Sequence, residues 1–402
     1  MSWPLVKLGE VAKLINGDRG KNYPSKGSFV DEGIPFINAG CLSNEHTLIE
    51  GALNYITEDK FDSLRSGKVE KGDILFCLRG SLGKFALVDT NMKGAIASSL
   101  VIIRANEKVH IDYLKHYLGS FLCQREIQAY ENGAAQPNLS ATDLKNFEIP
   151  LSPLTEQKRI AAILDKADAI RQKRKQAIEL ADEFLRSVFL DMFGDPVTNP
   201  KGWEERKLIS GLSKVQSGWS ANGESYPCTS NEFGVLKVSA VTSGYFKEYE
   251  NKFVPREKIP EGKRLLFPKR GDLLFSRANT RELVAATCIV TRDHDNVFLP
   301  DKLWKIELNE SLLPEFLHML IQQPRFKDKL TSQATGSSGS MLNISKSKFE
   351  QTKAIFPSIT EQIKFKEIYW KVTKSLTLIE ASQAKSDDFF NSLSQKAFSG
   401  QL

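Results

Sequence analysis

Signals for export and for membrane insertion are missing from this sequence of 402 residues. No window holds 18 uninterrupted apolar residues, and the first residues, MSWPLVKLGEVAKLING, do not run from charged to apolar to small residues. A bilayer-spanning helix and a secretory signal each require one of these patterns. We therefore expect neither, and a cytoplasmic location.

Cysteine is scarce and scattered. The five cysteines form no CxxC pair, and their number is odd. Disulfide frameworks and zinc sites use paired or closely spaced cysteines. We therefore expect reduced thiols that behave as small buried residues. The cysteines are Cys41, Cys77, Cys123, Cys228 and Cys288.

Catalytic motifs are also absent. The sequence contains no GxxxxGK[ST], no GxSxG, no HExxH and no NPPY- or DPPY-like tetrapeptide. These motifs mark phosphate cradles, nucleophile elbows, zinc proteases and adenine methyltransferases, and the five histidines show no metal-binding spacing. We therefore expect a protein that is not an enzyme and that holds no metal.

What is present is the composition of an ordinary globular protein, long enough for two to three domains. The net charge of +6 is unevenly placed. Residues 1–150 hold 17 Lys and Arg against 18 Asp and Glu, whereas residues 196–357 hold 24 against 18. A basic block is typical of nucleic-acid binding, so the charge favours such a partner for the second block.

The sequence repeats itself with an offset that drifts from 199 to 205 residues. GIPFINA at 33–39 aligns with GVLKVSA at 234–240, and KGDILF at 71–76 aligns with RGDLLF at 270–275. TEQ occurs at 155–157 and again at 360–362. Seven such matches in the same order indicate a duplicated unit.

Each copy combines short apolar runs with turn residues, followed by a helical stretch. IPFINA, DILFCL, FALVD and SLVIIRA are separated by Gly, Asn and Asp, which is typical of strands. HIDYLKHYLGSFLCQREIQAY and LLPEFLHMLIQQPRFKDKL follow with a helical pattern. The sequence therefore predicts a mixed α+β domain in each copy.

A long helix is predicted after each TEQ. A proline-containing segment keeps the preceding chain extended, and Thr155 and Thr360 are suited to cap the helices. Glu156 and Glu361 would place negative charge in the first turns. The first helix is expected to stop at FGDP, residues 193–196.

The two helices share a 3.5-residue rhythm, the period of a coiled coil. Polar residues interrupt both tracks near the centre, Arg171 and Arg174 in one and Gln383 and Ser386 in the other. The alternative is that each helix packs only against its own domain. The predicted apolar seam comprises Ile160, Leu164, Ala167, Ile178, Leu185, Val188, Phe365, Val372, Leu376, Ile379, Phe390 and Leu393.

Connectivity predicts the direction of these helices. The first leads from copy one to copy two, so in a symmetric duplication the second returns, antiparallel, about a pseudo-two-fold axis. The C-terminus should then finish near the N-terminus. Each seam track covers 32 residues, or about 48 Å at ~1.5 Å per residue.

One remaining motif resembles a nuclease site. Asp143, Glu156 and Lys158 have a plausible spacing, but the second copy reads EQI at 361–363. Because the copies differ at the catalytic position, we interpret TEQ as a helix start and expect no catalysis.

The duplicated plan resembles the specificity subunit of type I restriction–modification systems. The resemblance rests on the twin TEQ starts, the two GD[IL]LF strands, the segment GAAQPNLSATDLKNFEIPLSPLTEQKRIAAIL and the terminal AFSGQL, and it covers the whole chain. It implies target-recognition domains at 1–150 and 196–357 and conserved spacer helices at 151–195 and 358–402.

The resemblance also implies the function. Each target-recognition domain would read one half of a bipartite, asymmetric site on double-stranded DNA, and the helix pair would set the gap between the halves. The helices would hold two modification subunits that use S-adenosylmethionine to methylate adenine. Two further restriction subunits would supply ATP- and Mg-dependent translocation and cleavage. No cofactor is expected in this chain.

Loop side chains that can reach bases or phosphates are the expected DNA contacts. The family's Phe-Ser-Arg after the GD[IL]LF strand is kept at 275–277, but in the first copy Arg79 comes one step later, which leaves its role open. The predicted contacts are Arg19, Lys21, Asn22, Arg79, Ser81, Gln136, Asn138, Ser217, Trp219, Asn222, Arg277, Asn279, Thr280 and Arg281.

Two alternatives remain at this point. The chain could be a non-catalytic protein-interaction scaffold, with two binding modules on a coiled-coil rod. The basic run RQKRK at 171–175 could contact phosphate, although a solvated or partner-facing helix surface explains it better.

Overall fold

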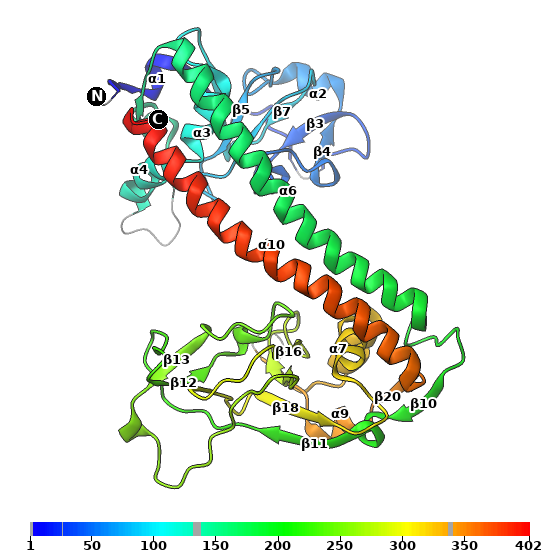
Figure 1. Cartoon of the computed structure of the whole chain (residues 1–402). Helices are drawn as coiled ribbons and strands as arrows, with labels where there is room; N and C mark the ends of the chain where they lie inside the picture. Colours follow the sequence, from blue (N-terminus) through cyan, green and yellow to red (C-terminus); the bar gives the residue numbers. More distant parts are fainter. Residues whose placement is uncertain (1–2, 26, 132–137, 337–340) are drawn as a thin grey trace. The chain divides into compact units, whose positions relative to one another are not determined.

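A computed structural model of the chain describes residues 3–25, 27–131, 138–336 and 341–402 (Figure 1). The chain forms two compact units. Unit 1 contains residues 1–175 and 381–402, and unit 2 contains residues 176–380. Both units mix helices with sheets, so the predicted α+β class is confirmed.

Unit 1 begins with a region of short strands and helices and then enters a long helix, α6. Its strands are β1 (Leu5–Lys7), β2 (Ala12–Asn16), β3 (Ile34–Ile37), β4 (Asn54–Ile56), β5 (Ile74–Cys77), β6 (Phe85–Leu87), β7 (Ala95–Ile96), β8 (Leu100–Ala105) and β9 (Glu148–Pro150). Its helices are α1 (Leu8–Val11), α2 (Glu58–Ser63), α3 (Ile111–Leu118), α4 (Phe121–Glu131), α5 (Ala141–Lys145) and the first part of α6 (Leu154–Phe193).

Unit 2 repeats this succession and ends in the second long helix, α10. Its strands are β10 (Glu204–Lys207), β11 (Leu212–Ser217), β12 (Phe233–Leu236), β13 (Asn251–Val254), β14 (Leu273–Ser276), β15 (Ala278–Asn279), β16 (Thr287–Ile289), β17 (Val297–Phe298), β18 (Leu303–Leu308), β19 (Leu342–Asn343) and β20 (Lys353–Phe356). Its helices are α7 (Pro314–Gln322), α8 (Pro324–Thr331), α9 (Lys346–Gln351) and the first part of α10 (Ile359–Ser399).

The sheets of the two units have the same strand order. A four-stranded sheet runs β2-β8-β5-β6 in unit 1 and β11-β18-β14-β16 in unit 2. A three-stranded sheet runs β4-β3-β7 and β13-β12-β17, and in both cases the first pair is antiparallel and the second parallel. The sequence repeat therefore encodes a repeat of topology.

The four-stranded sheet is buried on both faces, which explains its apolar strands. Along β5, Ile74 and Phe76 pack on the side of α3 and α6, whereas Leu75 and Cys77 pack against the side of the three-stranded sheet. Alternate residues of a strand point to opposite faces, so a strand covered on both sides needs a continuous apolar run. The two GD[IL]LF motifs supply that run.

Each predicted helical stretch before the TEQ segment is broken in two. In unit 1, α3 ends before Gly119 and α4 begins at Phe121. In unit 2, Pro324 is the first residue of α8, where it has no hydrogen bond to lose. The spacing of the apolar residues correctly predicts that these stretches are helical. It does not show where each stretch divides into two helices.

The prediction that Thr155 and Thr360 cap the long helices is wrong by two residues. α6 already begins at Leu154 and α10 at Ile359. The Pro153 carbonyl accepts from the N–H groups of Glu156 and Gln157 at 2.8 and 2.9 Å. Each threonine therefore lies inside the first turn, because the preceding residue already supplies the capping carbonyl.

In α10 this capping role falls to Ser358, which precedes the helix. Its carbonyl accepts from Glu361 N–H at 3.1 Å and from Gln362 N–H at 3.2 Å. Its hydroxyl also accepts from Glu361 N–H at 3.4 Å. Serine is a favoured capping residue, and here it takes the place that we had assigned to Thr360.

The glutamine of TEQ is a tertiary anchor. Gln157 is buried, and its Oε1 accepts from His110 N–H at 2.7 Å while its Nε2 donates to the carbonyls of Lys108 and Ser152 at 3.1 and 2.7 Å. Gln362 is equally buried and repeats this pattern with Leu313 N–H and the carbonyls of Ser311 and Pro357. A buried amide with its partners satisfied fixes the helix start against the segment before α3 or α7.

Within each unit the two long helices run antiparallel. In unit 1, Arg159 donates to the Leu402 carbonyl at 2.8 Å, and Arg174 donates to the Ser382 carbonyl at 3.2 Å. In unit 2, the Phe189 ring, near the end of α6, meets the Phe365 ring, near the start of α10, at 5.6 Å.

In both units a tryptophan side chain hydrogen-bonds a carbonyl at the C-terminal end of a long helix. Trp3 Nε1 donates to the Ala397 carbonyl, and Trp203 Nε1 donates to the Phe193 carbonyl, both at 2.9 Å. The described ends of the chain therefore lie together in unit 1, as predicted. Gly194, with φ 76°, follows α6 in the left-handed conformation that ends helices.

Two further features fit the sequence analysis. Among the described residues, no helix is long and apolar enough to cross a bilayer. All five cysteines, which lie in the described part of the chain, are free, and four of them are buried.

Candidate nucleic-acid interface

Arg277 is the centre of the predicted contacts in unit 2. It follows β14 directly, and its Nε donates to the Asp301 carbonyl at 2.8 Å. Its Nη1 donates to Asn343 Oδ1 at 2.9 Å, and its Nη2 pairs with Asp301 Oδ2 at 3.2 Å. The half-buried guanidinium therefore ties β14 to β19 and to the segment before β18.

The loop after β11 meets the same aspartate. Ser217 Oγ donates to the Asp301 carbonyl at 2.9 Å, and the Ser220 hydroxyl donates to the Asp301 carboxylate. Gly218 permits this approach, because an added Cβ would lie 1.9 Å from the Leu299 carbonyl oxygen. Asp301 was not among the predicted residues, although its opposite charge near Arg277 offered a signal in the sequence.

Trp219 and Asn222 occupy different environments in that loop. The Trp219 ring is half-buried and stacks on Phe298 with centroids 6.0 Å apart and an interplanar angle of 13°. Asn222 is exposed. Trp219 therefore braces the loop, and Asn222 has its side chain at the surface.

The three predicted contacts at β15 and in the loop after it differ in their exposure to solvent. Asn279 is buried, and its Oδ1 accepts from Thr280 N–H at 2.9 Å. Its Nδ2 has no partner among the described residues. Thr280 and Arg281 are exposed. Arg281 is thus available to a ligand, whereas Thr280 hydrogen-bonds the Glu282 side chain and Asn279 shapes the turn.

Unit 1 contains a counterpart of the Arg277–Asn343 bond. Arg79 Nε donates to Asn138 Oδ1 at 3.1 Å, and both side chains are exposed. In the backbone, Leu78 takes the place of Arg277, since Leu78 N–H donates to Ser99 and Arg277 N–H donates to the aligned Lys302. An arginine one step later therefore still reaches the equivalent asparagine, which answers the question that the sequence left open.

Two other contacts, Ser81 and Gln136, are predicted in the same part of unit 1 as Arg79. Ser81 is exposed, and its carbonyl accepts from Lys84 N–H at 3.1 Å in a tight turn. Gln136 lies outside the described residues.

The loop after β2 carries the remaining contacts of unit 1. Asn22 Nδ2 donates to the Ser63 carbonyl at 2.7 Å. Arg19 and Lys21 are exposed and make no ion pair with any residue that the structure describes. These two cations are therefore available to an anionic ligand.

Asp18, which the sequence analysis overlooked, holds this loop in place. Its carboxylate accepts from the N–H groups of Arg65 and Gly20 at 2.8 and 2.7 Å. These backbone hydrogen bonds, that of Arg65 first, keep the pKa of Asp18 below its usual value. The loop is thus anchored by a carboxylate that stays ionised.

The predicted seam residues are all buried or half-buried. Ile160, Leu164, Leu185, Phe365 and Leu376 are buried, and the other seven are half-buried. Ile160 and Leu164 belong to the core of unit 1, and Leu185 and Phe365 to that of unit 2. Each helix end therefore packs both on the other helix and on the globular part of its own unit.

The polar centre of the seam is an organised network in unit 1. The Arg171 guanidinium lies 4.5 Å from the Phe390 ring centroid and pairs with Asp168 at 2.6 Å. Gln383 Nε2 donates to Asp387 at 3.0 Å. These contacts use the cationic and amide groups that interrupt the apolar track.

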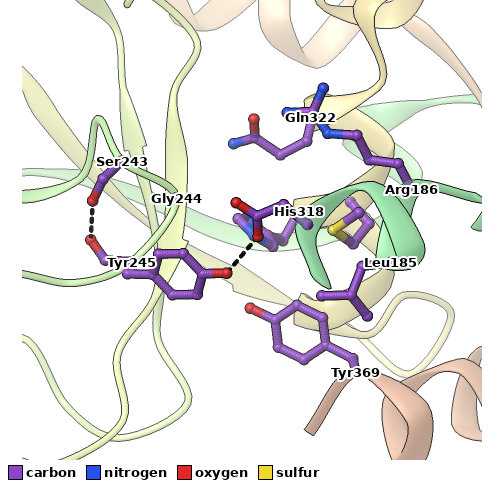
Figure 2. A pocket seen from close by; sticks show the side chains of 10 residues that line it. Leu185, Arg186, Ser243, Gly244, Tyr245, His318, Gln322 and Tyr369 are labelled. Carbon is purple, nitrogen blue, oxygen red and sulfur yellow. Dashed lines mark hydrogen bonds between the residues drawn. The ribbon is translucent and has the colours of Figure 1, made fainter. Parts of the chain in front are cut away.

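In unit 2 a small cleft separates α6 from a loop of the globular part (Figure 2). Tyr245 OH donates to Asp182 on α6 at 2.6 Å, and burial together with this carboxylate raises the pKa of Tyr245. His318, on α7, bonds Thr287 Oγ1 at 2.8 Å. Burial lowers the pKa of His318 to about 4, so the ring is neutral at pH 7.

The acidic residues of the nuclease-like spacing have local structural partners. Ser140 caps α5 by accepting from Asp143 N–H, the Asp143 carboxylate accepts in return from Ser140 N–H, and Glu156 pairs with Arg159. Among the residues that the structure describes, no group of three His, Cys, Asp or Glu side chains could hold a metal ion. The exposed Arg, Lys, Asn and Thr groups are instead donors suited to phosphates and base edges.

Known proteins are similar to this chain in sequence and in fold. Residues 2–180 match the family model described as type I restriction modification DNA specificity domain. The chain is 22% identical to the type I restriction enzyme EcoKI specificity subunit of Escherichia coli, over 100% of this chain and 89% of that protein. It is 30% identical to a putative type I restriction enzyme specificity subunit of Haemophilus influenzae, over 44% and 46%.

Solved structures agree on the fold. The S subunit of a type I restriction–modification system from M. genitalium superposes with a TM-score of 0.58 at 17% identity, over 99% of this chain and 96% of that one. A chain from a type I R-M system studied for complex assembly and conformational transition gives 0.52 at 18% identity, over 100% and 98%. The chain is thus similar to type I restriction enzyme specificity subunits over its whole length, and to the DNA specificity domain of that family over residues 2–180.

Proposed function

We propose that this chain reads a bipartite, asymmetric site on double-stranded DNA. Residues 1–150 and 196–357 act as target-recognition domains, one for each half of the site. The observation that carries this proposal is that the two units share their strand order but carry different side chains on equivalent loops. A repeated scaffold with different loop chemistry suits two different half-sites.

Arginine and asparagine at equivalent places support a common way of presenting these loops. Arg79 with Asn138 and Arg277 with Asn343 tie two loops together beside the four-stranded sheet of each unit. The exposed neighbours Arg19, Lys21 and Arg281 have the length and charge to reach phosphates or guanine edges. Recognition therefore falls to the exposed groups, and the bonded pairs position them.

The helices at 151–195 and 358–402 act as the spacer in this proposal. They form an antiparallel coiled coil that sets the gap between the half-sites and docks two modification subunits. S-adenosylmethionine, and ATP with Mg in two restriction subunits, would be bound by those partners in the cytoplasm. The chain itself supplies recognition and no chemistry.

The proposal can be tested by reconstitution. The chain is purified with its cognate modification subunit and incubated with a library of random DNA duplexes and S-adenosylmethionine. We expect methylated molecules to share a split motif with a constant gap. Methylation without sequence preference, or binding of the modification subunit without any effect on DNA choice, would leave only a protein-interaction scaffold.

A further inference from the structure

We propose that four exposed cations of unit 2 grip the phosphate backbone of duplex DNA beside the second recognition loop. This inference rests on the proposed function and adds to it a phosphate-binding surface found in only one of the two equivalent places. We call the four residues the basic group. They are Lys252, Arg256, Lys263 and Arg264.

Two residues of the basic group lie over aromatic rings. The Arg256 guanidinium lies 5.4 Å from the Phe233 ring centroid, and Lys263 Nζ lies 5.3 Å from the Trp219 ring centroid. Both rings pack around the buried Phe298 in one apolar cluster. The stems of these cations are therefore supported from below while the charges stay at the surface.

The same layer carries the predicted recognition loop. Glu224 N–H donates to the Phe253 carbonyl at 2.8 Å, and Phe253 N–H donates to the Tyr226 carbonyl at 2.9 Å. An added Cβ on Gly223 would lie 2.7 Å from Lys252 Cβ. Lys252 therefore lies next to the loop that presents Asn222.

The charges of the basic group are not neutralised within the protein. Lys258 pairs with Glu224 and Lys269 with Asp295, in the same part of the chain. None of the four residues of the basic group makes an ion pair within the described ranges. A polyanion that binds several unpaired surface cations at once gains more than it would from an isolated cation.

The equivalent element of unit 1 has a different charge. The connection from β4 to β5, residues 57–73, holds four Lys and Arg against five Asp and Glu, whereas the connection from β13 to β14, residues 255–272, holds six against three. In unit 1 two lysines lie over the Phe61 ring, Lys68 at 4.6 Å and Lys93 at 5.0 Å from its centroid, and Lys93 is paired with Glu58. The basic group is thus a property of unit 2 and not of the shared scaffold.

Duplex DNA is the ligand that this arrangement fits best. Spread cations on a rigid surface can follow a row of phosphates, and the adjoining loop offers Ser and Asn donors for the same strands. An acidic protein surface would satisfy the charges but gives no reason for their position beside that loop. The consequence is that unit 2 supplies most of the salt-dependent grip.

The test measures the salt dependence of binding. The chain in complex with its modification subunit is titrated onto a short duplex of random sequence over a series of KCl concentrations. In the basic-group variant, all four residues are changed to glutamine. Each lost phosphate contact lowers the slope of log K against log [KCl] by about 0.9, so we expect a slope shallower by about 3 to 4.

A matched variant removes four charges from unit 1. It carries Lys60→Gln, Lys68→Gln, Lys71→Gln and Lys93→Gln. We expect its slope to change by less than about 1, because these lysines lie among carboxylates. The double variant Lys252→Gln/Arg264→Gln leaves both ring-covering cations in place, and its slope should fall by about 2 if the four-fold variant is unstable.

Three outcomes separate the possibilities. Equal slope losses in the unit 1 and unit 2 variants would overturn the inference, since total charge alone would explain them. An unchanged slope with weaker binding of the modification subunit would also overturn it and assign the group to an acidic protein partner. If the wild-type complex methylates a random library without sequence preference, the proposed function fails, whatever the slopes are.

Discussion

Gln157 and Gln362 make the same three hydrogen bonds, one in each unit, at the start of the two long helices. In both, Oε1 accepts from the N–H before a short helix and Nε2 donates to two carbonyls. The helix starts are therefore fixed by a buried amide rather than by the capping threonine that the sequence suggested. This amide joins each long helix to the globular part of its own unit.

The first prediction concerns this amide. Gln157→Ala should lower the free energy of unfolding of unit 1 by about 2–4 kcal/mol, because three backbone groups lose their buried partner. Gln157→Glu should be nearly as harmful, since a carboxylate cannot donate to two carbonyls. Urea denaturation measures both. The exposed Gln176 serves as control, and Gln176→Ala should change stability by less than about 0.5 kcal/mol.

The second prediction separates the two half-sites. Arg277→Gln removes bonds to Asp301 and Asn343 and should reduce methylation that depends on one half-site by about 10- to 100-fold. Arg79→Gln should affect only the other half. Sequencing of methylated molecules from a random library gives both results at once, with the untouched half-site as internal control. Loss of the same half in both variants would contradict the assignment of one domain to each half.

The third prediction tests the spacer. One heptad inserted in each helix, after Lys175 and after Glu380, keeps the seam in phase and adds about 10.5 Å. This corresponds to about three base pairs of duplex. The motif should show a longer gap, or recognition should be lost. A heptad in only one helix should disrupt folding of the pair, and an unchanged gap with both insertions would refute the spacer role.

The fourth prediction follows from His318. Burial lowers the pKa of His318 to about 4 in the folded protein. Below pH 6.5 the imidazole therefore binds a proton in the unfolded chain but stays neutral in the folded unit until the pH approaches 4. Stability from this ring is complete above pH 6.5 and is lost as the pH falls toward 4. Between pH 7.5 and 5.0 the loss should be about 2 kcal/mol.

His318→Gln provides the comparison for that loss. The variant can be less stable at every pH, but its stability should fall by about 2 kcal/mol less than that of the wild type over the same pH interval. Urea denaturation at the two pH values measures the difference. An identical pH dependence in both proteins would show that another group carries it.

Much of the fold could be predicted because each pattern occurs in both copies of the repeat, so that chance patterns can be set aside. The strands at GD[IL]LF, the long helices and their antiparallel course within each unit followed from matched patterns. The anchoring glutamines did not, because two of the three partners of each lie 47 to 51 residues away and all are backbone groups, on which side-chain types carry no signal. Their identity in both copies was nonetheless visible at 157 and 362.

The predicted interface was harder to judge residue by residue. Asn279 and Trp219 have the right chemistry for DNA but are used within the protein, as turn and ring contacts. Asp18 and Asp301 escaped attention because acids are poor candidates for DNA contact, although they hold the loops in place. Sequence reveals which groups can bind, whereas packing decides which of them remain free to do so.

The pairing of β1 with β9, and of β10 with β20, makes the globular domain of each unit a replaceable insert. Its first and last strands are antiparallel neighbours, so the chain enters and leaves the domain at one place. Strand pairing through the backbone depends little on side chains. A foreign domain grafted between Lys7 and Glu148 need only reproduce that one pair of strands and the contacts to the helix ends, so under the proposed function one exchange at a single joint would replace half of the specificity.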